Sequence, residues 1–266
     1  MGTVNRRITW LLLLVLFAVC ILLLLAVCSR QSTESQPEEN ISATYSASSP
    51  APTAISTPIV ESFLQTFDLE TWNYYKEIAL YSEYGNSNPN GLIKKWQDDI
   101  RIYVNEFATE DDWSVLQGHV DAMNQISGIP HISFVQDAVL ANMSISFITQ
   151  SEMNKITEAL KEISFGYTKI WWNQETCITR AQIYIVCDKQ TTLERQHTIL
   201  EELTQAMGLM NDSGRYSDSI FYVHYSASIL SLSEMDWDLL RIHYADAIKA
   251  GMNSSTVTNL YPNGKR

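Results

Sequence analysis

The chain has few basic residues for its length, and this shortage limits its possible partners. Lysine and arginine number 18 against 30 aspartates and glutamates in 266 residues, a formal net charge of -12. Nucleic-acid binding requires a basic surface that pairs with phosphates, and the sequence contains no basic stripe of that kind. We therefore expect no nucleic-acid partner. The length is sufficient for one domain of ordinary size with additional segments.

Cysteine is also scarce, with four residues in the whole chain. Cys177 and Cys187 are the two that follow the N-terminal region, and their spacing is not the Cys-x-x-Cys of metal or redox sites. No turn residue lies between them. A single strand would hold them roughly 33 Å apart, far beyond the ~7 Å that a disulfide allows between Cα atoms. We expect two unpaired thiols.

Motifs of common hydrolases are missing as well. No Gly-x-Ser-x-Gly elbow accompanies the serines of the 213–219 segment or the nearby His224, so we interpret these serines as turn residues. Trp171–Trp172 and Trp237 could line a sugar or peptide cleft. Such aromatic residues more often cover a sheet or fill a core.

The N-terminal region predicts a membrane anchor. Arg6 and Arg7 precede 18 uncharged residues, Trp10 to Val27. As a helix this run would be roughly 27 Å long, close to the thickness of a bilayer core. Paired arginines favour a cytoplasmic N-terminus, so residues 1–28 predict a single-pass protein whose C-terminal domain lies outside the cytoplasm. The alternative is a lipoprotein signal with Cys28 as the lipidated residue, although Val27 fits that motif poorly.

A linker and one folded domain follow the predicted anchor. Residues 29–58 contain sixteen serines, threonines and prolines and have no helical or strand periodicity. This composition predicts an extended, solvated linker. For residues 59–266 the order helix, strand, helix, strands, helix, helix predicts an α+β fold with a mixed sheet. The principal helices are expected at 61–84, 109–126, 151–163, 193–207 and 233–251, and the strands at 96–104, 131–135, 143–148, 165–172 and 178–186.

The segment Glu201 to Asp212, which we call the frame segment, is the most informative stretch. Zinc proteases of the metzincin type carry His-Glu-x-x-His, two residues, Gly, two residues, and His or Asp. Here Glu202 occupies the general-base position and Gly208 the turn position. The three metal-ligand positions hold other residues, namely Glu201, Gln205 and Asn211.

These replacements argue against a zinc site. Zinc favours histidine nitrogen and cysteine sulfur, and one carboxylate with two amides would hold it weakly. His197 lies one turn before Glu201 and could add a nitrogen, but we interpret it as a surface or capping residue. Glu202 is either a general base beside a bound water or a carboxylate that holds the turn, and the second interpretation is favoured because an activating metal is not expected. We predict no metal and no other cofactor.

The frame segment also resembles a bacterial domain family of unknown function, the one numbered 2927. The family carries Glu-Glu-Leu-Thr-Gln-Ala-Leu-Gly-Leu followed by Asn-Asp-Ser, which matches residues 201–213 with Met207 in place of a leucine. Ser219–Phe221 matches its Ser-Ile-Phe segment, and the 239–252 region resembles its C-terminal elements. The resemblance implies a zincin-like fold with a metzincin-type helix and turn, in which Asp212 and Gly208 support the turn.

The sequence leaves three functional hypotheses open. We favour a membrane-tethered, non-catalytic binding module that holds a peptide, a glycan or an envelope protein in the cleft beside the frame segment. The alternative is a metallopeptidase-like hydrolase with an atypical metal site and Glu202 as general base. A third hypothesis is a structural domain that packs against a partner in the same membrane.

Overall fold

The computed structural model describes residues 66–81, 91–156, 164–224 and 228–261. The predicted anchor, the linker and the predicted domain start at residue 59 lie outside these ranges. Within them, no helix combines the length and the apolar character needed to cross a bilayer.

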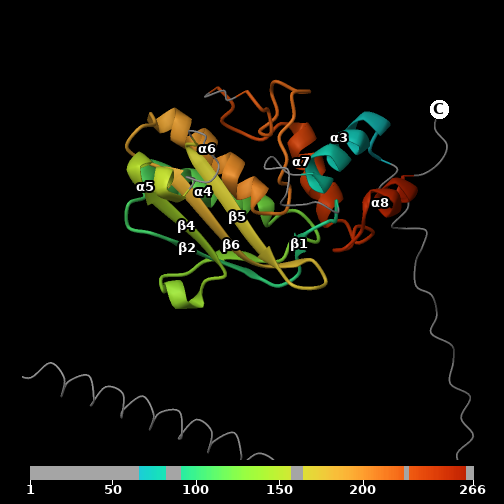
Figure 1. Ribbon diagram of the computed structural model, residues 1–266, viewed down its shortest axis with the longest axis horizontal. Helices are drawn as coiled ribbons and strands as arrows, with labels where there is room; N and C mark the ends of the chain where they lie inside the picture. Colours follow the sequence, from blue (N-terminus) through green and yellow to red (C-terminus); the bar gives the residue numbers. More distant parts are fainter. Residues whose placement is uncertain (1–65, 82–90, 157–163, 225–227, 262–266) are drawn as a thin grey trace, which may run out of the picture. The chain divides into compact units, whose positions relative to one another are not determined.

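A six-stranded mixed sheet forms the centre of the domain (Figure 1). Its strand order is β1-β6-β4-β2-β3, with parallel pairing throughout, and β5 adds an antiparallel partner to β6. The prediction of a mixed sheet is therefore confirmed. The strands are β1 Lys95–Trp96, β2 Ile100–Val104, β3 Ile132–Phe134, β4 Met143–Ile148, β5 Gly166–Trp172 and β6 Cys177–Val186.

Three of the helices begin where the sequence places hydroxyl caps. Thr109, Thr191 and Ser233 each form a capping box with the acid three residues later, which satisfies backbone N–H groups that the first turn leaves without partners. Figure 1 shows α3, α7 and α8 gathered at one end of the domain. The helices are α3 Leu69–Leu80, α4 Glu110–Met123, α5 Gln150–Ile156, α6 Thr192–Gln205, α7 Glu234–Tyr244 and α8 Ser254–Leu260, with a 3-10 turn, η1, at Ala138–Leu140.

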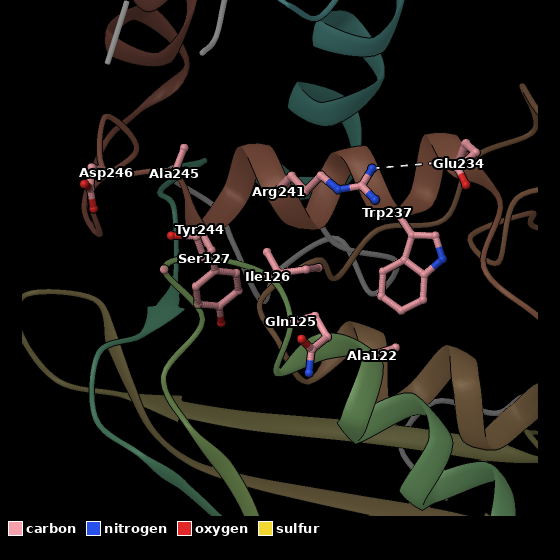
Figure 2. A pocket seen from close by; sticks show the side chains of 11 residues that line it. Ala122, Gln125, Ile126, Ser127, Glu234, Trp237, Arg241, Tyr244, Ala245 and Asp246 are labelled. Atoms are coloured by element: carbon pink, nitrogen blue, oxygen red, sulfur yellow. Dashed lines mark ion pairs between the residues drawn. The ribbon is translucent and has the colours of Figure 1, made fainter. Parts of the chain in front are cut away.

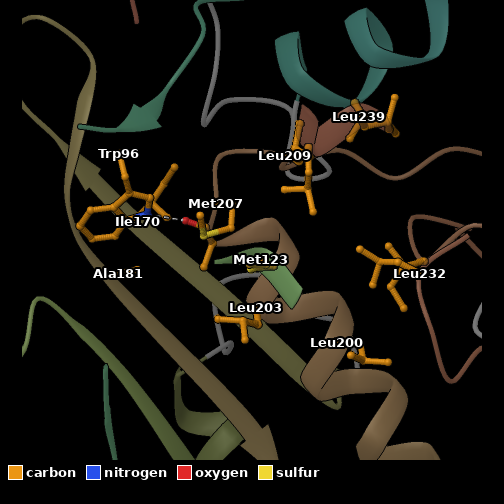
Figure 3. Close-up of a cluster of buried hydrophobic side chains, with 14 of the residues drawn as sticks. Trp96, Met123, Ile170, Ala181, Leu200, Leu203, Met207, Leu209, Leu232 and Leu239 are labelled. Atoms are coloured by element: carbon orange, nitrogen blue, oxygen red, sulfur yellow. Dashed lines mark hydrogen bonds between the residues drawn. The ribbon is translucent and has the colours of Figure 1, made fainter. Parts of the chain in front are cut away.

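The two faces of the sheet differ in what covers them. One face, here called the inner face, carries the isoleucines of β2, β4 and β6 and packs against α4 and α6 in a continuous apolar core. Leu203 and Met207 fill this core beside Trp96, whose indole N–H donates to the Ala206 carbonyl over 2.9 Å (Figure 3). The opposite, outer face carries the alternate residues of the same strands, which are half-buried or exposed over most of its extent.

Several predicted boundaries change in the structure. The strand predicted at 96–104 is two strands, because residues 97–99 leave the sheet between β1 and β2. The helix predicted over 233–251 ends at Tyr244, and a short helix that the periodicity did not predict, α8, follows it. Cys177 and Cys187 are both free thiols, as expected from a continuous β6.

Candidate functional site

The frame segment occupies the last two turns of α6 and the chain that leaves it. Gly208 has a φ of +107°, which side chains other than glycine rarely adopt. A Cβ at this position would also overlap the Lys94 carbonyl oxygen. The predicted turn at Gly208 is therefore confirmed, and it brings the end of α6 against the segment that enters β1.

The side chains at the three ligand positions contact the protein itself. Gln205 is 5 % exposed, and its amide donates to a carboxylate oxygen of Asp212 over 3.2 Å. The Asn211 amide donates to the Asp212 backbone carbonyl over 2.9 Å. Glu201 lies one turn from His197, with 3.6 Å between its Oε2 and the histidine Nε2. The structure thus brings the predicted residues together in two groups, Gln205 and Asn211 with Asp212, and Glu201 with His197.

His197 is not the surface or capping residue predicted from the sequence. Its side chain is 2 % exposed, and Nδ1 lies 2.9 Å from the Ile229 carbonyl. Burial lowers the pKa of this imidazole, although the Ile229 carbonyl acts in the opposite direction. The Ile229 carbonyl lies against this turn of α6, and helical periodicity alone does not reveal a contact with a residue 32 positions away.

Glu202 lies on the buried side of α6 and is 6 % exposed. Its side chain approaches Gly166 at the start of β5 so closely that a Cβ on that glycine would overlap Oε1. The Glu202 backbone carbonyl accepts from the Thr168 hydroxyl over 3.0 Å. The carboxylate therefore lies between α6 and β5, and the absence of a side chain at Gly166 makes room for it.

The donor set of the frame segment does not suit zinc. Its three ligand positions present one carboxylate and two amides, and the buried amide of Gln205 already donates to Asp212. Among the residues that the structure describes, no group of three or more His, Cys, Asp or Glu side chains is arranged to hold a metal ion. A zinc-dependent step at these positions therefore has no support in the donor chemistry.

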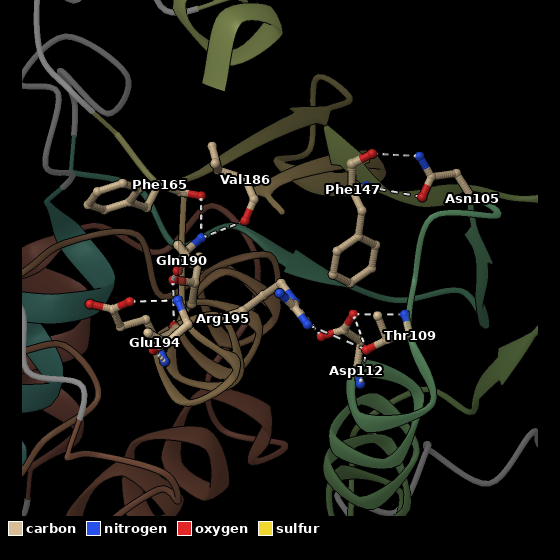
Figure 4. A network of polar contacts seen from close by, with 11 residues as sticks. Asn105, Thr109, Asp112, Phe147, Phe165, Val186, Gln190, Glu194 and Arg195 are labelled. Atoms are coloured by element: carbon tan, nitrogen blue, oxygen red, sulfur yellow. Dashed lines mark hydrogen bonds and ion pairs between the residues drawn. The ribbon is translucent and has the colours of Figure 1, made fainter. Parts of the chain in front are cut away.

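A buried ion pair on α6 was missed by sequence reasoning. Arg195 donates from Nε to Oδ1 of Asp112 over 2.6 Å, and the Asp112 side chain is fully buried (Figure 4). The same carboxylate closes the capping box of α4 with Thr109. The sequence predicts Asp112 at a helix start, but its second partner is 83 residues away and has no local signal.

A second buried network holds the segment that follows the frame. Ser219 donates to Asp236 over 2.5 Å, and the Tyr74 hydroxyl lies 2.8 Å from the same serine oxygen. Burial raises the pKa of Asp236, while its bonds to Ser219, Ile220 and Ser233 act in the opposite direction. Ser219 is thus a buried structural residue, in line with its interpretation as part of a turn and not of a hydrolase site.

The C-terminal end of α7 carries a third group of buried polar side chains. Burial and the neighbouring Lys95 ammonium lower the pKa of His243 to about 3. Lys95 donates to the carbonyls of His243 and Ile248, each over 2.9 Å, and burial lowers its pKa to about 8. These contacts fix the end of α7, and they confirm that His243 belongs to the packed helix.

A cavity of about 650 Å³ lies between the end of α4 and α7 (Figure 2). Trp237 and Ile126 line it, together with Arg241 and Glu234, which form an ion pair at 3.7 Å. Of the three tryptophans considered as cleft residues, Trp237 lines this cavity. Trp171 and Trp172 lie elsewhere, at the end of β5.

Solved structures similar to this chain are zinc proteases or proteins named myroilysin, at low similarity. High choriolytic enzyme 1 is a hatching-enzyme zinc protease from the medaka fish Oryzias latipes. It is 11% identical to this chain with a TM-score of 0.34, and the matched region covers 56% of this chain and 94% of the enzyme chain. A myroilysin structure is 11% identical with a TM-score of 0.31, and the matched region covers 60% of this chain and 68% of the myroilysin chain. Likenesses of this size do not assign an activity. None of the curated proteins compared with the chain matches it.

A family match covers residues 69–263, which is most of the chain and almost all of the described domain. The match includes the frame segment, the Ser219–Phe221 segment and α7, which are the elements on which the resemblance was based. The chain belongs to the family described as protein of unknown function DUF2927.

Proposed function

We propose that the domain is a non-catalytic binding module that keeps the helix and turn of a zinc-protease frame without a zinc centre. Its ligand would be a peptide, a glycan or a protein of the cell envelope, held beside the frame segment. The N-terminal run Trp10 to Val27 would tether it to a membrane, outside the cytoplasm, either as a spanning helix or by lipidation of Cys28.

One observation carries this proposal, namely the hydrogen bond between Gln205 and Asp212. Gln205 stands where the frame has its second histidine, and its side chain is buried. An amide that donates to a neighbouring carboxylate satisfies both groups inside the protein. We infer that this contact holds the turn at Gly208, a task that a metal ion performs in proteins with the histidine ligands.

The test is the substitution Gln205→Leu, measured by thermal unfolding and elemental analysis of the same samples. Removing the amide leaves the Asp212 oxygen without this donor, so stability should fall by about 1–2 kcal/mol. The metal content should not change. The matched control is Gln117→Leu, because Gln117 makes an exposed i,i+4 bond to Asp121 on α4. An unaltered melting temperature for Gln205→Leu would contradict the proposed role.

A second candidate function is peptide hydrolysis with Glu202 as general base. The observation that favours it is the pair of His197 and Glu201, which places a nitrogen and a carboxylate 3.6 Å apart on α6. With Gln205 and Asn211 these two residues would form the atypical metal site. Cleavage of a peptide library that stops on addition of a chelator and in Glu202→Gln would establish this function and exclude the binding module.

A further inference from the structure

The outer face of the sheet has an unusual composition for a chain with a net charge of -12. Its outward-pointing side chains include three cations, Arg101 on β2, Lys169 on β5 and Arg180 on β6, all of them exposed. In the described strands β2, β4, β5 and β6, none of the residues on this face is acidic. The nearest carboxylates along the chain stand in loops, such as Asp99 before β2.

Aromatic rings lie between these cations. Tyr167 and Tyr184 are cross-strand partners, and their rings stack with 6.5 Å between centroids and 14° between planes. At the other end of the strands, the Trp171 ring has the Lys169 ammonium 5.0 Å and the Arg180 guanidinium 4.8 Å from its centroid. All three rings are partly exposed, so the face presents apolar ring surface next to positive charge.

Neutral hydrogen-bonding groups occupy the positions between these rings and cations. The register places Lys169 opposite Gln182, Gln182 opposite Ser144, and Ser144 opposite Tyr103. These four form a row that crosses the sheet from β5 to β2. A second row joins Trp171 and Arg180 across β5 and β6. Since a strand rises about 3.3 Å per residue, Arg180 and Tyr184 are roughly 13 Å apart, which gives an extended polymer several contacts.

The helices that the structure describes leave most of this face half-buried or exposed. α4 and α6 pack on the inner face, and α5 follows β4 and packs against β6. At the alternate positions of β6, the buried residues are Ile178 and Val186, which lie towards the two ends of the strand. The rows from Tyr184 to Arg180 remain half-buried or exposed.

We propose that the outer face of the sheet binds an acidic polysaccharide, a glycan chain that carries carboxylates. Aromatic rings would pack against the apolar faces of sugar rings, the guanidinium of Arg180 would pair with a carboxylate, and Gln182 and Ser144 would bond to hydroxyls. A membrane surface fits less well. Interfacial binding requires a continuous apolar surface, whereas on this face Ser144 and Gln182 lie between the rings and the cations.

This site is separate from the frame segment, and its ligand does not depend on the function proposed there. The cations of the face would lie within a Debye length, about 8 Å at physiological ionic strength, of a bound polymer. Binding should therefore be measurable at physiological salt despite the overall net charge.

The experiment is calorimetric titration of the full-length chain in detergent with polygalacturonate of defined length. Its methyl ester is the matched neutral polymer, and polyglutamate and anionic phospholipid vesicles are the competing ligands. We expect binding to polygalacturonate that is lost with the ester. No binding to polygalacturonate, equal binding to the ester, or stronger binding to polyglutamate or vesicles would overturn the proposal.

Single substitutions locate the site on the outer face. Trp171→Ala should weaken binding about tenfold, because a well-packed ring contributes up to about 1.5 kcal/mol beyond its buried area. Arg180→Ala should weaken it about fivefold, the upper end for an exposed ion pair.

The control variants are Trp237→Ala in the cavity beside α7 and Arg215→Ala on the segment after the frame, which should bind as the wild type does. If Trp171→Ala does not fold, the affinities of Lys169→Ala and Arg180→Ala for polygalacturonate test the proposal, because both side chains are exposed. Unchanged affinity in both would place the ligand elsewhere and refute the assignment.

Discussion

The frame segment and the outer face of the sheet use their polar side chains in opposite ways. In and around the frame segment, polar groups are buried and bonded to other parts of the protein, as in the pairs Gln205–Asp212 and Arg195–Asp112. On the outer face, Lys169 and Arg180 are exposed, and each of these cations lies over the Trp171 ring. The first region has the arrangement of a structural support, and the second has groups available to a ligand.

This difference shows why a motif is weak evidence of activity in this chain. The frame segment keeps the general-base and turn positions of a zinc protease, yet its buried Gln205 amide donates to Asp212 within the same segment. The outer face matches no motif, because its residues come from four strands. They become neighbours only through the pairing of these strands in the sheet. A site built across strands is visible only when the strand partners are known.

The largest effect is expected for Asp112→Ala, which removes one partner of the buried pair with Arg195. An unpaired guanidinium in a buried position costs about 3–5 kcal/mol. Chemical denaturation monitored by circular dichroism measures the loss. The control is Asp238→Ala, which removes the partly exposed pair with Arg241 at 2.7 Å and should cost about 1 kcal/mol or less. Similar losses of unfolding free energy in both variants would contradict the distinction between buried and exposed polar contacts.

Gly208→Ala should be the next most damaging change. The new Cβ would require a rarely adopted φ and would overlap the Lys94 carbonyl, so we expect a loss of about 3 kcal/mol. Gly118→Ala is the matched control, because nothing lies within 4 Å of its added Cβ in the middle of α4. There alanine should stabilise by about 0.5–1 kcal/mol. Equal effects in denaturation would show that the turn of the frame segment is not constrained.

Acidification should weaken the domain through its buried histidines. Burial lowers the pKa of His119 to about 4, and its Nε2 lies 3.0 Å from the Thr204 hydroxyl on α6. The folded pKa lies below the unfolded value, so this contribution is complete above pH ~6.5 and is lost as pH falls towards 4, by about 1.4 kcal/mol per unit. His119→Gln should reduce the slope of stability against pH by that amount. The control is His131→Gln at an exposed position, and an unchanged slope in His119→Gln would contradict the explanation.

Arg180→Ala should have the smallest effect on stability. Its side chain is exposed and its ring contact with Trp171 is on the surface, so the unfolding free energy should change by about 0.5 kcal/mol or less. Thermal unfolding measures it together with Arg101→Ala, which removes a bond from Nε to the Leu140 carbonyl over 2.7 Å on the same face. A large loss in Arg180→Ala would make the outer face a structural surface and weaken the contrast with the frame segment.

The sequence predicts the local parts of this fold well. Hydroxyl caps three residues before an acid locate the starts of α4 and α7, and the alternation of apolar and polar residues locates β4. Each signal lies within a few neighbouring residues. The turn at Gly208 belongs to the same class, because glycine after an apolar helical face is a local signal.

Contacts between distant segments were not predictable in the same way. The burial of His197 depends on residues near Ile229, and the role of Asp112 depends on Arg195. The end of α7 at Tyr244 is held by the Lys95 ammonium, which donates to the carbonyl of His243 inside the helix and to that of Ile248 after it. In each case the two partners are far apart in the sequence, so no local pattern predicts their contact. Only the folded chain brings them together.

The most direct test of the proposed function is the metal content of the purified full-length chain after dialysis against zinc and then against metal-free buffer. The residues at the ligand positions Glu201, Gln205 and Asn211 predict no retained stoichiometric metal. Unchanged stability of the protein in the presence of a chelator would agree with this. About one zinc ion per chain, together with peptide cleavage that disappears in Glu202→Gln, would contradict the interpretation of the frame segment as a support without metal.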